Sequence, residues 1–188
     1  LPSNVMIPSL FLPRPNWPLA IACLYLLLQT GSAFAERADR DKPVHIEFQS
    51  TELGDRDKTT IFKGNVRLTQ GSLEISCDRL VIAEDAGGYY HGVATPKPGE
   101  LAKFKDKLEG KNEQVYGEAE RIEFDTRQDR IRLFERAYVK KGTDEVRGRY
   151  IERDGYAETF KATNGPAGTA TQGAPQAEVI LQPRTKST

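Results

Sequence analysis

The side chains most capable of chemistry are few in this 188-residue sequence and poorly placed to act together. His45 and His91 are the only histidines, and neither has a partner at the spacing of a metal site. Cys77 shares the alternation of Leu73 and Ile75, which favours a buried small apolar side chain over a nucleophile. Gly-x-Ser-x-Gly elbows, phosphate-binding glycine loops and Cys/His clusters do not occur in the sequence. We therefore expect a protein that is not an enzyme and that holds no metal or cofactor.

The charged residues are numerous and balanced. The chain has 27 lysines and arginines against 27 aspartates and glutamates, so it lacks the basic excess that a nucleic-acid partner would require. Carboxylates such as Glu118, Glu120 and Glu123 are interpreted as solubilising side chains on the exposed side of strands. The composition thus predicts no nucleic-acid partner.

Alternating apolar and polar residues predict strands along most of the chain. Val44, Ile46 and Phe48 alternate with polar neighbours, and this period of two indicates a half-buried strand. Turn-forming residues separate further runs of the same kind, at residues 61–68, 73–82, 122–124, 131–133 and 179–181. Short strands at this spacing predict a sandwich, jellyroll or barrel, and no segment convincingly predicts a helix.

The sequence also contains an internal repeat. Matching positions of its two copies are separated by a constant number of residues, which we call the repeat offset. Residues 62–71 (FKGNVRLTQG) align with residues 133–142 (LFERAYVKKG), so that apolar positions match in both copies. The matched pairs are Phe62 with Leu133, Val66 with Ala137, Leu68 with Val139, Ile75 with Val146 and Leu80 with Ile151. Any two amphipathic strands could align in this way, but agreement over two strands and their turn favours a duplicated β unit.

The first 35 residues predict an export signal. Arg14 is their only charged residue, Leu19–Leu28 is an apolar run of ten residues, and Ala33-Phe34-Ala35 forms a small-x-small site. This order predicts a secretory signal peptide at 1–35, cleaved after Ala35. Lipidation at Cys23 is the weaker alternative, because the apolar run continues past that residue. The remainder predicts one β domain at 36–183, with a flexible loop at 164–177 and a disordered tail at 184–188.

Three segments in this order resemble a known family. They are residues 41–47 (DKPVHIE), 62–71 (FKGNVRLTQG) and 75–80 (ISCDRL), and the similarity continues through 117–124 (GEAERIEF) to 179–183 (VILQP). Together they resemble the signature of the LptA, or OstA-like, family of periplasmic lipopolysaccharide-transport proteins. One departure is plain, because the family usually has a second Gly-Asn-Ala element where this sequence reads Glu135-Arg136-Ala137. That departure puts the shape of one strand in doubt.

The resemblance implies a fold and a role. The fold would be a single antiparallel, twisted, V-shaped β-jellyroll whose apolar interior shelters the acyl chains of lipid A. The role would be transport of lipopolysaccharide across the periplasm for outer-membrane assembly. Protomers would associate head to tail, joining an LptC-like inner-membrane jellyroll to an LptD-like outer-membrane protein. Two alternatives are a periplasmic carrier of another lipid-bearing client, such as lipoproteins, and a ligand-free structural β-repeat protein.

The resemblance also assigns the inward-facing apolar residues, which would be plain core in any β sandwich, to a lipid-binding groove. Phe104 lies among three lysines, which are either exposed surface residues or contacts for lipid phosphates. The lysines are Lys103, Lys105 and Lys107. The predicted groove residues are Val44, Ile46, Phe48, Phe62, Val66, Leu68, Leu73, Ile75, Leu80, Ile82, Phe104, Ile122, Phe124, Ile131 and Leu133.

Overall fold

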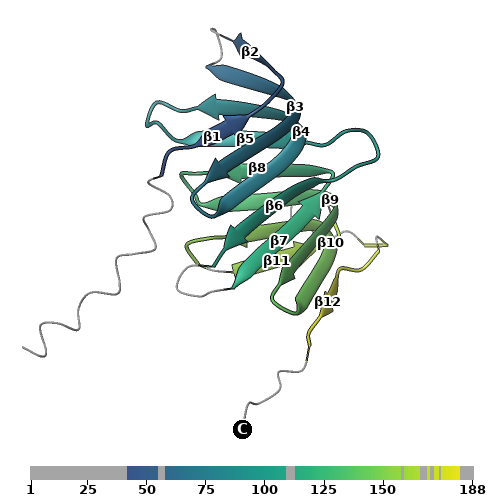
Figure 1. Cartoon of the computed structure of the whole chain (residues 1–188). Coiled ribbons are helices and arrows are strands. Elements are labelled where there is room, and N and C mark those ends of the chain that lie inside the picture. The colour runs from purple at the N-terminus through teal and green to yellow at the C-terminus, as the bar shows by residue number, and fades with distance from the viewer. Residues whose placement is uncertain are drawn as a thin grey trace, which may run out of the picture. The chain divides into compact units, whose positions relative to one another are not determined.

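The domain that follows the first 35 residues is built from antiparallel strands, and the described residues contain no helix (Figure 1). The computed structural model describes residues 42–54, 58–108, 113–157, 159–165, 169, 172–173 and 175–182. The predicted signal peptide at 1–35 and tail at 184–188 lie outside these residues, as does part of the predicted loop at 164–177. The described residues of that loop form turns and irregular backbone.

Four long strands organise the sheet, and short strands pair with their halves. The long strands are β3 (Thr59–Gln70), β4 (Leu73–Glu84), β9 (Arg130–Lys141) and β10 (Asp144–Asp154). The short strands are β1 (His45–Glu47), β2 (Ser50–Gly54), β5 (Tyr90–Thr95), β6 (Ala102–Lys107), β7 (Gln114–Ala119), β8 (Arg121–Asp125), β11 (Thr159–Thr163) and β12 (Glu178–Ile180).

Each long strand belongs to two layers, because its halves pair with different neighbours. In the first layer β2, β5, β8 and β11 join the halves of the long strands in the order β2-β3-β4-β5-β8-β9-β10-β11. In the second layer β1, β6, β7 and β12 join the other halves in the order β1-β3-β4-β6-β7-β9-β10-β12. The layers thus diverge from shared bends, as a jellyroll requires.

The bends are β-bulges in which two residues oppose one. In β3 the register shifts between Lys63 and Val66, where Gly64 and Asn65 have φ angles of 82° and 46°. Such left-handed backbone suits Gly and Asn, and a bulge sharpens the local twist and bend. The strand therefore turns from one layer into the other where the sequence supplies Gly-Asn.

The second bend keeps this shape although its residues are Glu135 and Arg136. Their φ angles are 56° and 47°, in the same left-handed region. Arg149, the residue opposite, donates two hydrogen bonds to the Glu135 carboxylate at 2.8 and 2.9 Å. Arg136 donates to Glu120 at 2.6 Å. The departure from Gly-Asn thus leaves the strand's shape intact, and exposed ion pairs accompany a backbone conformation that these residue types disfavour.

The predicted duplication is confirmed. The repeat offset that relates Phe62 to Leu133 also relates both ends of β2 to those of β8, and both ends of β3 to those of β9. The turn glycines Gly71 and Gly142 share a φ angle of 58°, and Lys58 and Asp129 share one of 47°. Each half repeats the same five pairings around its two long strands. The halves are joined through β5–β8 in one layer and β6–β7 in the other.

The core lies between the two layers and contains most of the residues that the alternation places inside. Phe48 is an exception, because it is 42% exposed between β1 and β2, where the chain passes from one layer to the other and the alternation is interrupted. The predicted inward residues that are buried are Val66, Leu68, Ile75, Leu80, Ile82, Phe104, Ile122, Phe124, Ile131 and Leu133. Val44, Ile46, Phe62 and Leu73 are partly buried against them.

Gly64→Ala should destabilise the fold. An added Cβ would clash with the side chain of Gln49, and the φ angle of 82° disfavours any L side chain. We expect a loss of about 1–2 kcal/mol in the free energy of unfolding, measured by urea titration. The double variant Gly64→Ala/Gln49→Ala separates the two causes, because it relieves the clash and leaves the backbone strain. An unchanged midpoint for Gly64→Ala would contradict the left-handed bend.

Candidate functional site

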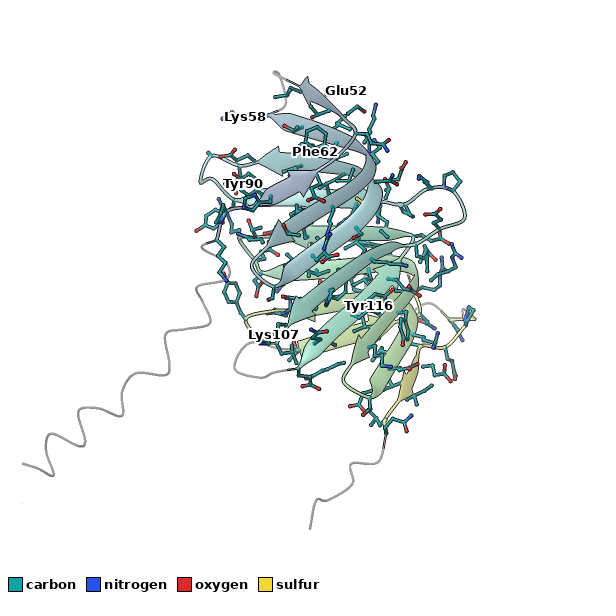
Figure 2. The ribbon with its side chains drawn as sticks, viewed as in Figure 1. Glu52, Lys58, Phe62, Tyr90, Lys107 and Tyr116 are labelled. Atoms are coloured by element: carbon teal, nitrogen blue, oxygen red, sulfur yellow. The ribbon has the colours of Figure 1, made fainter. Side chains whose placement is uncertain are left out.

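An apolar pocket opens between the two layers in the N-terminal half of the domain. Its volume is about 200 Å³. This is below the roughly 300–1,000 Å³ of a typical small-molecule site, so the pocket would take part of a ligand. Phe62 and Tyr90, both in its lining, lie in this half of the molecule (Figure 2). The apolar lining consists of Val44, Ile46, Phe62, Leu68, Leu73, Ile82 and Phe124.

The predicted groove residues therefore divide into two sets. The seven apolar lining residues above are brought together around an open space. Seven others are nearly or fully inaccessible and form the packed core behind and beyond it: Val66, Ile75, Leu80, Phe104, Ile122, Ile131 and Leu133. Phe48 belongs to neither set, although its ring lies 5.0 Å from that of Phe62. The interior between the layers thus contains an open pocket and a packed core.

Polar residues complete the pocket lining, and the alternation of apolar residues gave no signal for them. They are Thr60, Gln70, Tyr90 and Thr126. The backbone N–H of Tyr90 donates to Oγ1 of Thr126 at 2.8 Å, which ties the ends of β5 and β8 together. Gln70 Nε2 donates to the Lys42 carbonyl at 3.1 Å. These bonds lie at the ends of strands, so polar groups surround an apolar interior.

The lysines beside Phe104 point away from this interior. Phe104 is buried, whereas Lys103, Lys105 and Lys107 are exposed on the outer face of β6. Lys103 lies opposite Glu118 of β7, and Lys105 opposite Glu74 of β4. Lys107 ends the strand (Figure 2). Their contact with lipid phosphates stays a prediction, and the geometry places only Lys107 at the end of a strand.

The reactive side chains are not assembled into a catalytic or metal-binding group in the described residues. His45 and His91 are exposed on different strands. The part of the chain that the structure describes contains no group of three or more His, Cys, Asp or Glu side chains that could hold a metal. Within the same residues no helix has the length and hydropathy needed to cross a membrane. The pocket is therefore best suited to binding an apolar group.

Comparisons with known proteins agree on one family. Residues 45–159 match the family model described as LptA/(LptD N-terminal domain) LPS transport protein. The lipopolysaccharide export system protein LptH of Pseudomonas aeruginosa is 23% identical over 160 residues, covering 85% of this chain and 90% of that protein. LptA of Escherichia coli strain K12 is 28% identical over 125 residues, which is 65% of each chain.

A solved structure supports the same fold. The crystal structure of Pseudomonas aeruginosa LptH, described as the LptA homologous periplasmic component of the lipopolysaccharide transport device, has a TM-score of 0.69. It shares 22% sequence identity, and the match covers 77% of this chain and 99% of that one. The likeness confirms the predicted all-β fold.

Cys77 should resist alkylation in the folded protein. Burial raises the pKa of its thiol to about 12, with a smaller contribution from the neighbouring Asp78 carboxylate. The thiolate is the reactive form, so at pH 8 its fraction should be roughly a thousandfold below that of a free cysteine. We expect iodoacetamide to label Cys77 slowly in the native protein and rapidly in urea, as measured by peptide mass spectrometry. Rapid native labelling would contradict the partly buried placement that the structure gives Cys77.

Proposed function

Because this chain belongs to the LptA/(LptD N-terminal domain) family of LPS transport proteins, we propose that it carries lipopolysaccharide with the acyl chains of lipid A held between its two layers. Two relatives are named lipopolysaccharide export system proteins, and LptH is described as a periplasmic component of that transport device, which supports this role and a periplasmic location. Cleavage of residues 1–35 after Ala35 is part of the proposal. Transport of this kind requires no catalytic step, and we propose none.

The apolar pocket between the layers is the observation that supports this binding mode. An acyl chain in water costs about 0.8 kcal/mol for each exposed CH₂ group, so a carrier must cover it. The pocket offers seven apolar side chains from β3, β4, β8 and the segment before and within β1, with polar groups at its margin. Acyl chains would enter this space while the sugars stay in water.

Another lipid-bearing client would use the same apolar pocket, and a ligand-free structural protein would use none. The family match favours lipopolysaccharide over both.

The two ends of the sheet support head-to-tail association. β1 and β2 form the edges at one end, and β11 and β12 form the edges at the other (Figure 1). Exposed apolar side chains gather there, including Leu53 at 74% exposure and Leu181 at 72%. Unpaired strand edges with exposed apolar residues favour pairing with another chain.

The duplication specifies a register for this association. Glu74 pairs with Lys105 of β6, and Glu145, its counterpart at the repeat offset, pairs with Ile180 of β12. β12 is therefore the structural equivalent of β6, and β1 is the structural equivalent of β7. Transferring the β6–β7 register to two copies pairs Glu178–Ile180 with His45–Glu47 of the next copy over the full length of both strands.

The other layer gives a matching result. Arg79 pairs with Thr95 of β5, and Tyr150, the counterpart of Arg79 at the repeat offset, pairs with Thr163 of β11. Transferring the β5–β8 register pairs all of β11 with all of β2 of the next copy. Two independent registers thus give full-length pairing at one joint. LptC-like and LptD-like jellyrolls would bind through the same edges at the ends of a stack.

Photo-crosslinking in cells tests the binding mode. A crosslinking residue at Ile46 or Phe62 should trap lipopolysaccharide, because both side chains line the pocket. Glu47 and Lys63 are the matched controls, since each is the next residue in the chain and points away from the pocket. We expect at least a fivefold higher yield at the pocket positions. Equal crosslinking yields at the pocket positions and the control positions would contradict the proposal.

Disulfide crosslinking tests the assembly register. In a Cys77→Ser background, Val179→Cys/Ile46→Cys should give a ladder of oligomers on oxidation, because the transferred register places these residues opposite each other. The control Ile180→Cys/Ile46→Cys puts the two thiols on opposite faces and should crosslink weakly.

Deleting residues 179–188 should collapse the concentration-dependent oligomers seen by sedimentation while leaving β content intact. Equal crosslinking of both pairs, or unchanged oligomers after the deletion, would contradict assembly through β12.

A further inference from the structure

A buried ion pair crosses the interior beyond the pocket. Arg153 Nη1 of β10 lies 2.9 Å from Asp106 Oδ2 of β6, and the two side chains are only 6% and 13% exposed. The half of β10 that contains Arg153 belongs to the first layer, and β6 belongs to the second. The pair therefore joins the two layers directly.

The surroundings of the pair are those of the groove interior. Arg153 lies between Ile131 of β9 and Phe160 of β11 in its sheet register. Its Nε has no hydrogen-bond partner although it is buried. Asp106 also accepts a hydrogen bond from Ser72 at 2.9 Å, and the next residue, Leu73, lines the pocket. The ion pair is thus linked through Ser72 to the residue next to the pocket lining.

The duplication shows that this charge is a departure from the pattern of the first half. At the repeat offset, Arg153 is the counterpart of Ile82, which lines the open pocket. Lys105 of β6 and Ile180 of β12 are equivalent, because their partners on β4 and β10 are related by the repeat offset. The next residues, Asp106 and Leu181, are therefore equivalent as well. At the proposed joint between copies the equivalent positions are therefore Leu181 and Ile82 of the next copy, both apolar. The ion pair thus belongs to the joint within the chain and has no equivalent at the joint between copies.

We propose that the Arg153–Asp106 ion pair is a latch that holds the two layers together in the unloaded protein and must open for acyl chains to pass along the groove. This inference rests on the proposed function. A buried ion pair suits the task because the cost of removing both charges from water nearly cancels their attraction. The latch can therefore be a specific closure without being a large source of stability.

The rate at which the protein takes up lipid A tests the latch. The open variant Arg153→Ile/Asp106→Ala restores the first-half residue and removes its partner, and the charge swap Arg153→Asp/Asp106→Arg preserves the pair. The matched control is Arg132→Ile/Glu152→Ala, which removes an arginine–carboxylate ion pair of 3.0 Å on the outer face of β9 and β10. We expect lipid A to load at least fivefold faster into the open variant. The swap and the control should load within twofold of the wild type.

Loading of the open variant at the wild-type rate, or an equal acceleration of the control, would overturn the latch. If the wild type binds no lipid A, the proposed function fails instead. A second measurement remains informative even if the open variant does not fold. Spin labels at Lys105 and Lys161, exposed on β6 and β11 in a Cys77→Ser background, should show a longer distance when wild-type protein binds lipid A. An unchanged distance with lipid bound would overturn the latch as well.

Discussion

The structure depends on the bends that let four strands serve two layers. At each bend two residues oppose one, so the inward alternation continues on β3 and β9 and changes phase on β4 and β10. Apolar side chains then face inward on both sides of the bend, from Phe62 to Val66 and from Cys77 to Leu80. Without this phase change one layer would expose its apolar face to water. The space between the layers follows from it.

The duplication extends the same constraint along the molecule. Because each half repeats the same pairings, the joint inside the chain supplies the register of the proposed joint between chains. The residues at equivalent positions nevertheless differ. Arg153 and Asp106 form a buried ion pair within the chain, whereas the apolar residues Ile82 and Leu181 occupy the equivalent positions. A repeated backbone thus holds an open pocket in one half and a buried ion pair at the joint between the halves.

Period-two alternation was enough to predict the all-β class and most of the core, and the alignment of residues 62–71 with 133–142 predicted the duplicated unit. Alternation failed at Phe48, where the chain changes layer, because it does not report where a strand ends. It also could not separate the pocket lining from the packed core, since Ile82 and Leu80 share one pattern and differ only in what lies across from them. Arg153 was missed because the sequence Arg153-Asp154-Gly155 predicts a turn, whereas the strand β10 extends to Asp154. Comparison with Ile82, its counterpart in the first copy of the repeat, was the available signal.

The central claim is that the interior between the layers holds lipid A. Organic extraction of the protein purified from the periplasm, followed by mass spectrometry, tests it most directly. The account predicts lipid A-bearing molecules in near-stoichiometric amount, and their loss when a charged residue such as Asp replaces Ile82 in the pocket. A protein free of lipid, or one that carries a different lipid and ignores the substitution, would contradict it.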